Sequence, residues 1–189
     1  MNAITTFLWK KILASTVEQA VRLVGKARAR RVLLIGENTN ALSHALSDSV
    51  EQLEVLNHNA LHTLLVRSQK KIQAGRPFLD AKDGSFDLCL VSFGLHQVEP
   101  EVAEQIVRDC MRIAPTALLI DFALAERNIE LPSQYICSIA EQFLHRGHWD
   151  IYKKYIRVGA LHGIAHRAQT SEFSNITIWG GGIRLLLVG

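Results

Sequence analysis

Three short, almost wholly apolar segments alternate with helical patterns, and this alternation constrains the fold more than any other feature. The segments are 32–35, 86–93 and 117–120. Strands that are apolar on both faces are typical of a parallel sheet covered by helices on each side. Helical periodicity recurs between the strands, for example at Val102 and Ile106. The pattern predicts an α/β fold with a doubly wound, mostly parallel sheet.

The two ends of the chain extend this pattern. Residues 1–30 are expected to form an N-terminal helical segment, and 31–189 an α/β domain, within a single domain overall. Apolar runs at 176–179 and 183–188 flank a triple glycine. A glycine turn of this kind makes two neighbouring strands antiparallel. A late helix is expected over 149–168.

Composition is that of an ordinary soluble protein of 189 residues, with 48% hydrophobic residues and a net charge of +3. The cysteines are odd in number and widely spaced, which favours a reducing compartment and predicts a cytoplasmic protein. No apolar run is long enough to span a membrane. The three cysteines are Cys89, Cys110 and Cys137.

Basic residues gather in the N-terminal region. They could suit an acidic partner, but a solvated helix face is the explanation that we favour. Arginines and aromatic residues do not interleave along any strand, so nucleic acid is not an expected partner. The basic residues are Lys10, Lys11, Lys26, Arg28, Arg30 and Arg31.

The strand at 32–35 runs into Gly36, and a helical pattern begins near Asn40. A strand, a glycine turn and a helix near the start of an α/β chain form the usual site of a nucleotide-like cofactor. A dinucleotide dehydrogenase needs the GxGxxG pattern and an acid about 20 residues later. This loop has one glycine, and the second strand ends at Asn57. We therefore reject the hypothesis that the chain is a dinucleotide-dependent dehydrogenase.

Three segments resemble class I S-adenosylmethionine-dependent methyltransferases, most closely the branch of quinone and sterol C-methyltransferases. Residues 83–98 match the pattern DGSFDxVxxxxxLHHV, with Gln97 in place of one histidine. Residues 111–122 and 152–168 resemble two later family segments. The resemblance implies a Rossmann-like, seven-stranded sheet with an antiparallel strand near the C-terminus, and S-adenosylmethionine as cofactor.

The departures from the family fall on the cofactor motifs, so the cofactor motif is degenerate. Leu34 replaces the acid that orients the loop and the methionine amino group in the family, and Asn38 and Asn40 replace glycines. Asparagine tolerates the left-handed backbone region better than most residues, so the turn is expected to survive with a narrower mouth. Glu37 is the acid that can replace the one lost at Leu34, or it is an ordinary exposed loop acid.

Carried over position by position, the resemblance assigns the cofactor to loop and strand-end residues. Asp80-Ala81 resembles the family's adenine-side "GDA", and Asn57 is a neutral substitute for the acid that binds the ribose hydroxyls. We expect the strand ends to meet in one cavity at the carboxyl edge of the sheet. The cofactor-binding set is Gly36, Glu37, Asn38, Asn57, Asp80, Ser92 and Phe93.

The candidate catalytic residues are His96 and Asp121, each of which follows a buried strand. Histidine can take a proton near neutral pH, and the resemblance places this position near the reacting methyl group. The alternatives are a histidine packed at a strand end and an aspartate that caps a turn.

Tyr135, Trp149 and Tyr152 are the candidate substrate residues, because they lie in the segment that covers the substrate in the family. Aromatic side chains suit a flat, partly apolar molecule, although helix packing also explains them. No metal site is expected: histidines recur four apart at 58/62 and 162/166, but HExxH and a third ligand are absent.

Two hypotheses follow. The first is a methyltransferase acting on a small, partly apolar molecule, with an altered cofactor loop. The second is a non-catalytic methyltransferase-like module that binds a protein partner or another ligand. The intact segment 92–98 favours the first, and the loop departures favour the second.

Overall fold

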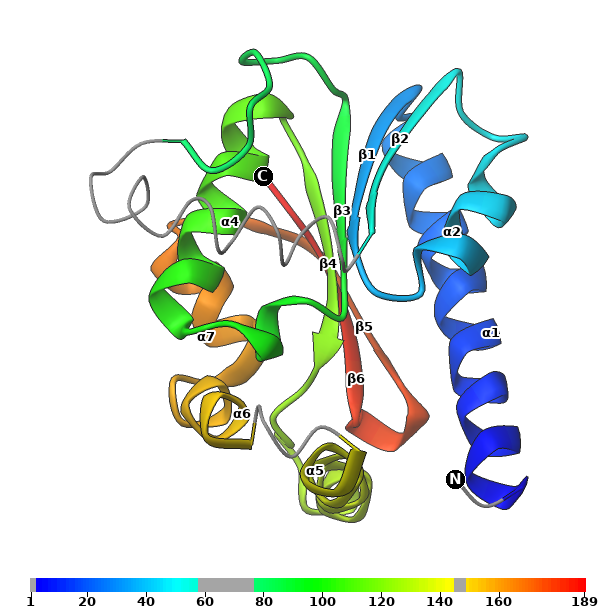
Figure 1. Ribbon diagram of the computed structural model, residues 1–189, viewed down its shortest axis with the longest axis vertical. Helices are drawn as coiled ribbons and strands as arrows, with labels where there is room; N and C mark the ends of the chain where they lie inside the picture. Colours follow the sequence, from blue (N-terminus) through cyan, green and yellow to red (C-terminus); the bar gives the residue numbers. More distant parts are fainter. Residues whose placement is uncertain (1–2, 58–76, 145–148) are drawn as a thin grey trace.

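The computed structural model describes residues 3–57, 77–144 and 149–189, which form one twisted sheet with helices on both faces (Figure 1). The strand order is β2-β1-β3-β4-β6-β5, and β1, β2, β3 and β4 are mutually parallel. The central strands are buried along their length, whereas β2 is largely exposed. The strands are β1 (Arg31–Gly36), β2 (Gln52–Asn57), β3 (Leu88–Ser92), β4 (Ala117–Phe122), β5 (Glu172–Ile178) and β6 (Ile183–Val188).

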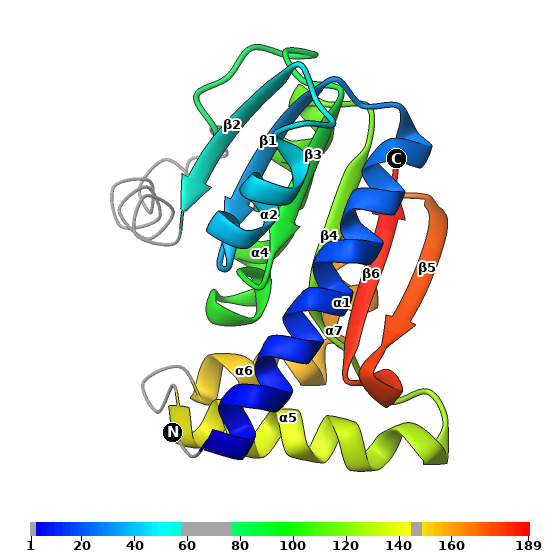
Figure 2. The same ribbon diagram turned by 90° about the vertical axis from the view of Figure 1, so that its right-hand side faces the viewer.

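The helices divide between the two faces of the sheet. Helices α1 and α2 cover one face, with α1 crossing the half that contains β4, β6 and β5, and α4 and α7 cover the other (Figures 1 and 2). The helices are α1 (Ala3–Ala27), α2 (Thr39–Leu46), α4 (Pro100–Ile113), α5 (Leu131–Leu144), α6 (Trp149–Arg157) and α7 (Ala160–Arg167); short 3-10 turns are η1 (Leu95–Gln97), η2 (Asn128–Glu130) and η4 (Trp179–Gly181).

The predicted α/β architecture is confirmed, including the antiparallel closing pair. Strand β6 is antiparallel to both β4 and β5, and the triple glycine lies in and after the turn that joins β5 to β6. The described part of the chain contains six strands rather than the seven expected. The sequence pattern also favours a helix over 60–72, and that segment lies outside the described residues.

The segment 77–87, which leads into β3, is bonded to side chains at the end of α4. The Asp109 carboxylate accepts hydrogen bonds from the backbone N–H groups of Phe78 and Leu79. Arg112 donates to the carbonyl oxygens of Leu79 and Ala81, both at 2.8 Å. The backbone is bonded to side chains of a helix, so it is not available to a neighbouring strand.

The late helix is broken into α6 and α7 at Gly159. This residue has φ 99°, a left-handed conformation that favours glycine. Four residues later, a Cβ on Gly163 would lie 1.8 Å from the carbonyl oxygen of Val158. The two glycines therefore permit a tight break between α6 and α7 that the helical periodicity of the sequence does not predict.

Candidate functional site

Strands β1 and β3 approach closely at their carboxyl ends, and Gly36 makes this approach possible. Its φ is 112°, and an added Cβ would lie 2.1 Å from the carbonyl oxygen of Ser92. The next residue, Glu37, donates its backbone N–H to the same oxygen at 2.7 Å. The backbone geometry therefore requires glycine at position 36.

The turn that follows contains a left-handed residue other than glycine. Asn38 has φ 54° and ψ 22°, in the left-handed region, and its carbonyl oxygen accepts a hydrogen bond from Leu42 at 3.3 Å as α2 begins. Asparagine is among the few residues with a side chain that occupy this region readily. The expected survival of the turn is confirmed.

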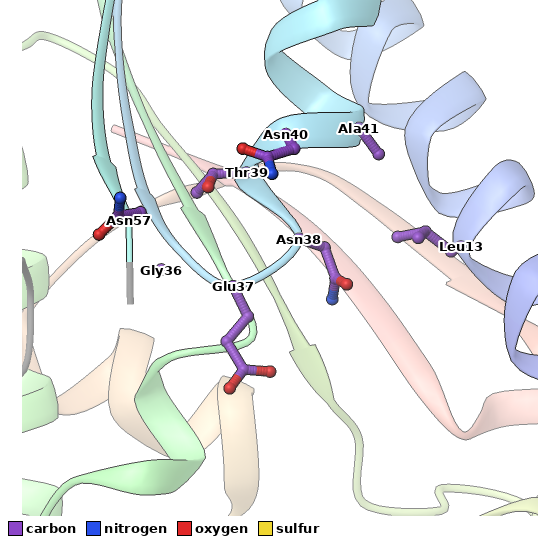
Figure 3. A pocket seen from close by; sticks show the side chains of 8 residues that line it. All are labelled: Leu13, Gly36, Glu37, Asn38, Thr39, Asn40, Ala41 and Asn57. Atoms are coloured by element: carbon purple, nitrogen blue, oxygen red, sulfur yellow. The ribbon is translucent and has the colours of Figure 1, made fainter. Parts of the chain in front are cut away.

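A cavity of about 590 Å³ opens beside this turn (Figure 3). The loop between β1 and α2 forms one wall, Asn57 at the end of β2 forms another, and α1 contributes Leu13. The cavity lies at the carboxyl ends of parallel strands, where open α/β sheets bind their ligands. The described lining residues are Leu13, Gly36, Glu37, Asn38, Thr39, Asn40, Ala41 and Asn57.

The described lining of the cavity includes four of the seven expected cofactor residues, Gly36, Glu37, Asn38 and Asn57. Ser92 is fully buried and is the register partner of Gly36. Phe93 is also buried, with φ 48°, and its ring lies 5.6 Å from that of Trp9 on α1. Neither belongs to the described lining, so their contribution is to shape the loop and to seat α1.

The remaining one, Asp80, lies elsewhere. It is exposed, between Leu79 and Ala81, whose carbonyl oxygens accept hydrogen bonds from Arg112 at the end of α4. The segment 77–87 leads into the start of β3 (Figure 1), whereas Gly36 is the last residue of the parallel strand β1 and lies at the opposite edge of the sheet. The expectation that Asp80 shares a cavity with Gly36 is wrong for this structure. The "GDA" likeness was local, and the contacts with α4 set the position of the loop.

His96 and Asp121 form a buried pair. The Nδ1 atom of His96 lies 2.6 Å from Oδ1 of Asp121, and the two side chains are 2% and 0% exposed. The same carboxylate accepts backbone N–H bonds from Leu95, His96 and Phe122 at 2.9, 3.2 and 2.7 Å. The structural alternative predicted for Asp121 is therefore observed, because Asp121 caps the turn at η1; it also contacts the imidazole.

Aromatic rings surround this histidine. The centroids of Phe122 and Tyr152 lie 4.7 and 6.2 Å from that of His96, and Trp149 stacks on Tyr152 with a centroid distance of 5.7 Å. Two of the three predicted substrate residues thus lie beside the predicted catalytic pair. The third, Tyr135, is 67% exposed on α5 and is not among the rings of this cluster.

Tyr155 and Arg184 belong to the same buried region. Tyr155 lies in the same aromatic segment of the sequence as Tyr152, whereas sequence reasoning missed Arg184. The Tyr155 hydroxyl donates to the carbonyl oxygen of Phe122 at 2.8 Å. Burial raises the pKa of this phenol well above its usual value, the charge of Asp121 adds to that effect and Arg184 opposes it. Arg184 is the register partner of Asp121 and also pairs with Glu126. An arginine within the apolar run 183–188 was the available signal.

The loop acid Glu37 is also held at its carboxylate. The side-chain amide of Gln97 on η1 donates to Oε1 of Glu37 at 2.8 Å.

Within the described residues, no cluster of three or more His, Cys, Asp and Glu side chains has the arrangement of a metal site. The described helices include none that is long and apolar enough to cross a membrane.

Comparison with known proteins identifies the fold. No protein-family model and no curated protein sequence matches the chain. Among solved structures, magnesium protoporphyrin IX methyltransferase from Synechocystis, with bound S-adenosylhomocysteine, is similar over 100% of this chain and 87% of its own, with 14% identity and a TM-score of 0.61.

Two further solved structures are matched over a smaller share of their own length. PigF with S-adenosylhomocysteine is matched over 95% of this chain and 56% of its own, with 15% identity and a TM-score of 0.56. Mitomycin 7-O-methyltransferase MmcR is matched over 92% and 53%, with 16% identity and a TM-score of 0.51. The chain therefore spans about half the length of these two proteins. It has the Rossmann-like fold of class I S-adenosylmethionine-dependent methyltransferases.

Proposed function

We propose that this protein is an S-adenosylmethionine-dependent methyltransferase that acts on a small, partly apolar molecule, in the manner of the quinone and sterol C-methyltransferase branch. The observation that carries the proposal is the cavity beside Gly36. It lies at the carboxyl ends of β1 and β2, is lined mainly by amide, hydroxyl and carboxylate groups, and has kept its turn although two glycines are lost.

The lining residues fit the chemistry of the cofactor. Asn57 offers an amide to ribose hydroxyls, and Glu37 offers a carboxylate to a cationic group. The cofactor supplies an activated methyl group when it is bound, so the protein's task is mainly alignment, which can lower a barrier by ~7–11 kcal/mol. A catalytic triad is not needed for such a reaction.

The His96–Asp121 pair is the proposed catalytic group on the acceptor side. Asp121 accepts the Nδ1 proton, which makes Nε2 the basic nitrogen of the imidazole. The neighbouring rings of Trp149 and Tyr152 suit an apolar acceptor. His96 is 2% exposed, so in this proposal the acceptor reaches it only when the aromatic side chains move.

The test is calorimetry with S-adenosylmethionine and S-adenosylhomocysteine, followed by a methyl-transfer screen of phenols and quinols. Wild-type protein is expected to bind both nucleosides. His96→Gln should abolish transfer and leave the dissociation constant of S-adenosylhomocysteine within about twofold, or ~0.4 kcal/mol. Failure of the folded wild type to bind either nucleoside would refute the proposal.

A second candidate, a non-catalytic module, is favoured by two observations. Leu34, at the position of the family's acid, is completely buried between β2 and β3, and His96 is sealed by its neighbours. Large apolar side chains are exposed along η2 and α5, where a protein partner is able to bind; they are Ile129, Leu131, Tyr135 and Ile136. Nucleoside binding without methyl transfer to any acceptor would favour the non-catalytic module over the methyltransferase.

A further inference from the structure

Strand β5 lies at one edge of the sheet. Among the described residues, its one strand neighbour is β6, so its outer side has no strand beside it. Figure 2 shows β5 along one side of the molecule, with the start of α5 below the turn that joins β5 to β6. The outward backbone groups of an edge strand are a ready template for pairing with a strand of another chain.

The register of the sheet determines which residues of β5 direct their backbone groups outward. The N–H of Ala123, just after β4, bonds to the carbonyl oxygen of Gly182 at 3.1 Å. Because the direction alternates along an antiparallel strand, every second residue of β6 counted from Gly182 points its backbone groups toward β4. The residues between them point toward β5, where Leu185 is the register partner of Ile176.

Asn175 and Thr177 flank Ile176, so their backbone N–H and C=O groups point to the outer side of β5. Antiparallel pairing with a second copy, about a twofold axis at Ile176, sets Asn175 of each copy opposite Thr177 of the other. The outward groups of both residues then bond across the axis. No like charges meet in this pairing, because the one charged residue of β5 is Glu172, which lies 3.3 Å from His162 of its own chain.

The same pairing covers exposed apolar side chains at the two ends of β5. Phe173, near the start of the strand, is 60% exposed, and Ile129 and Leu131, in and next to η2, are 78% and 53% exposed. The turn η2 packs against η4 at the end of β5, since a Cβ on Gly181 would lie 2.4 Å from Cγ of Glu130. Antiparallel pairing places the start of each β5 beside the η4 and η2 turns of the other copy.

We propose that the outer edge of β5 is a homodimer interface, at which two copies of this chain join their sheets by antiparallel β5–β5 pairing about Ile176. A stable interface buries about 800 Å² on each partner. A strand of seven residues is about 24 Å long, so its edge covers part of that area and the apolar side chains at its ends complete it. The inference goes beyond the proposed function and does not depend on it.

The other edge strand of the described sheet differs in charge. Strand β2 carries Glu54, and Glu51 directly precedes the strand. Charged side chains of this kind are typical of strand edges that do not pair with other chains. The two outward residues of β5 are neutral, which favours β5 over β2 as the edge that pairs.

Sedimentation velocity of the full chain tests whether the dimer forms. As concentration rises from about 1 to 100 μM, the wild-type protein is expected to change from the mass of one chain to twice that mass. Thr177→Pro removes an outward N–H that makes no bond to β6, so the variant should fold and its dimer dissociation constant should rise at least tenfold, about 1.4 kcal/mol. Thr177→Lys places a charge on the edge and should have the same effect.

The matched control is Val55→Lys on β2, at a side chain that is 42% exposed. It should leave the dimer dissociation constant within about twofold. Circular dichroism shows whether each variant is folded. A wild-type protein that stays monomeric throughout, or a dimer that both folded Thr177 variants leave unchanged, would overturn the interface.

A cysteine at the axis tests the register. Facing Cα atoms of a non-hydrogen-bonded pair lie about 4.5 Å apart, within the range for a disulfide. Ile176→Cys should therefore link to its counterpart in the second copy when oxidised glutathione is added: the two thiols lose two electrons and two protons, and the glutathione disulfide is reduced to two thiols. The wild type is the background, since its three cysteines are buried. Asn175→Cys should link more slowly, and faster linking of that variant would overturn the register.

Discussion

The Asp121 carboxylate holds His96 at two points, since Oδ1 lies 2.6 Å from the imidazole Nδ1 and Oδ2 accepts the His96 backbone N–H at 3.2 Å. One side chain at the end of β4 thereby fixes both the position of η1 and the orientation of the ring. The same residue serves structure and candidate chemistry, so the two roles have to be separated by experiment.

Asp121→Ala tests the structural role. The change removes the acceptor of three buried backbone N–H groups and of the imidazole, so the free energy of unfolding should fall by about 3–5 kcal/mol. Urea unfolding followed by circular dichroism measures it. Asp150→Ala is the control, because that side chain is 84% exposed and its loss should cost less than about 0.5 kcal/mol. Equal effects of the two substitutions would contradict the role given to Asp121.

Gly36→Ala tests the contact between β1 and β3. The new Cβ would lie 2.1 Å from the Ser92 carbonyl oxygen, at a residue whose φ is 112°. The strained backbone should lower the free energy of unfolding by about 1–3 kcal/mol. Gly25→Ala is the matched control: a Cβ there meets nothing within 4 Å, and alanine favours the helix by about 0.8–1 kcal/mol. A stable Gly36→Ala protein would show that the strand ends separate easily.

Restoring glycines to the loop should improve binding. Asn38 already occupies the left-handed region, so Asn38→Gly with Asn40→Gly is expected to preserve the turn while removing two side chains from the cavity lining. We predict at least tenfold tighter binding of S-adenosylhomocysteine, about 1.4 kcal/mol, measured by calorimetry. Unchanged affinity would mean that these side chains do not obstruct the ligand.

Adding Leu34→Asp to these two changes restores the family's acid, and the triple variant should keep the gain of at least tenfold. The substitution has a structural cost, because Leu34 is fully buried and its burial contributes about 1.5–3 kcal/mol. Urea unfolding of the double and triple variants isolates this cost. A triple variant as stable as the double would show that the new carboxylate finds partners in β2 or β3.

Asp87 makes stability depend on pH in the acid range. Hydrogen bonds from the Arg31 side chain and backbone lower its pKa from 3.8 to about 2. The folded state therefore binds this proton less tightly than the unfolded chain does. Its contribution to stability is complete above about pH 4 and is lost as pH falls through about 2. As pH falls from about 4 to about 2, the difference in free energy of unfolding between wild type and Asp87→Asn should therefore shrink. A difference that stays constant over this range would exclude ionisation of Asp87 as its source.

The strands that are buried on both faces were predictable from sequence, as were the Gly36 turn and the antiparallel closing pair. Their signals are local: continuous apolar runs, one glycine and a glycine cluster. The loop near Asp80 was not predictable, because its place is set by Asp109 and Arg112 on a helix that comes later in the chain. Those contacts leave no trace in the local pattern.

The candidate site shows the same limit. Gly36 and Asn57 were found because they end apolar strands, whereas the bond between Glu37 and Gln97 joins residues 60 apart and has no periodic signature. What the sequence does contain is one departure from the family pattern, Gln97, at one end of that bond. The separation of Tyr135 from Tyr152 was likewise hidden, since it depends on how α5 and α6 pack.

The placement of β6 between β4 and β5 has a consequence for how the protein is made. In the described sheet, β5 pairs only with β6, so it has no place to dock while the later strand is still unmade. A chain synthesised as far as β5 presents the open edge of β4 together with an unpaired strand, a combination that invites exchange between neighbouring chains. The sheet therefore cannot assemble in the order of translation, and docking of β6 is the step that commits the C-terminal half to the native state.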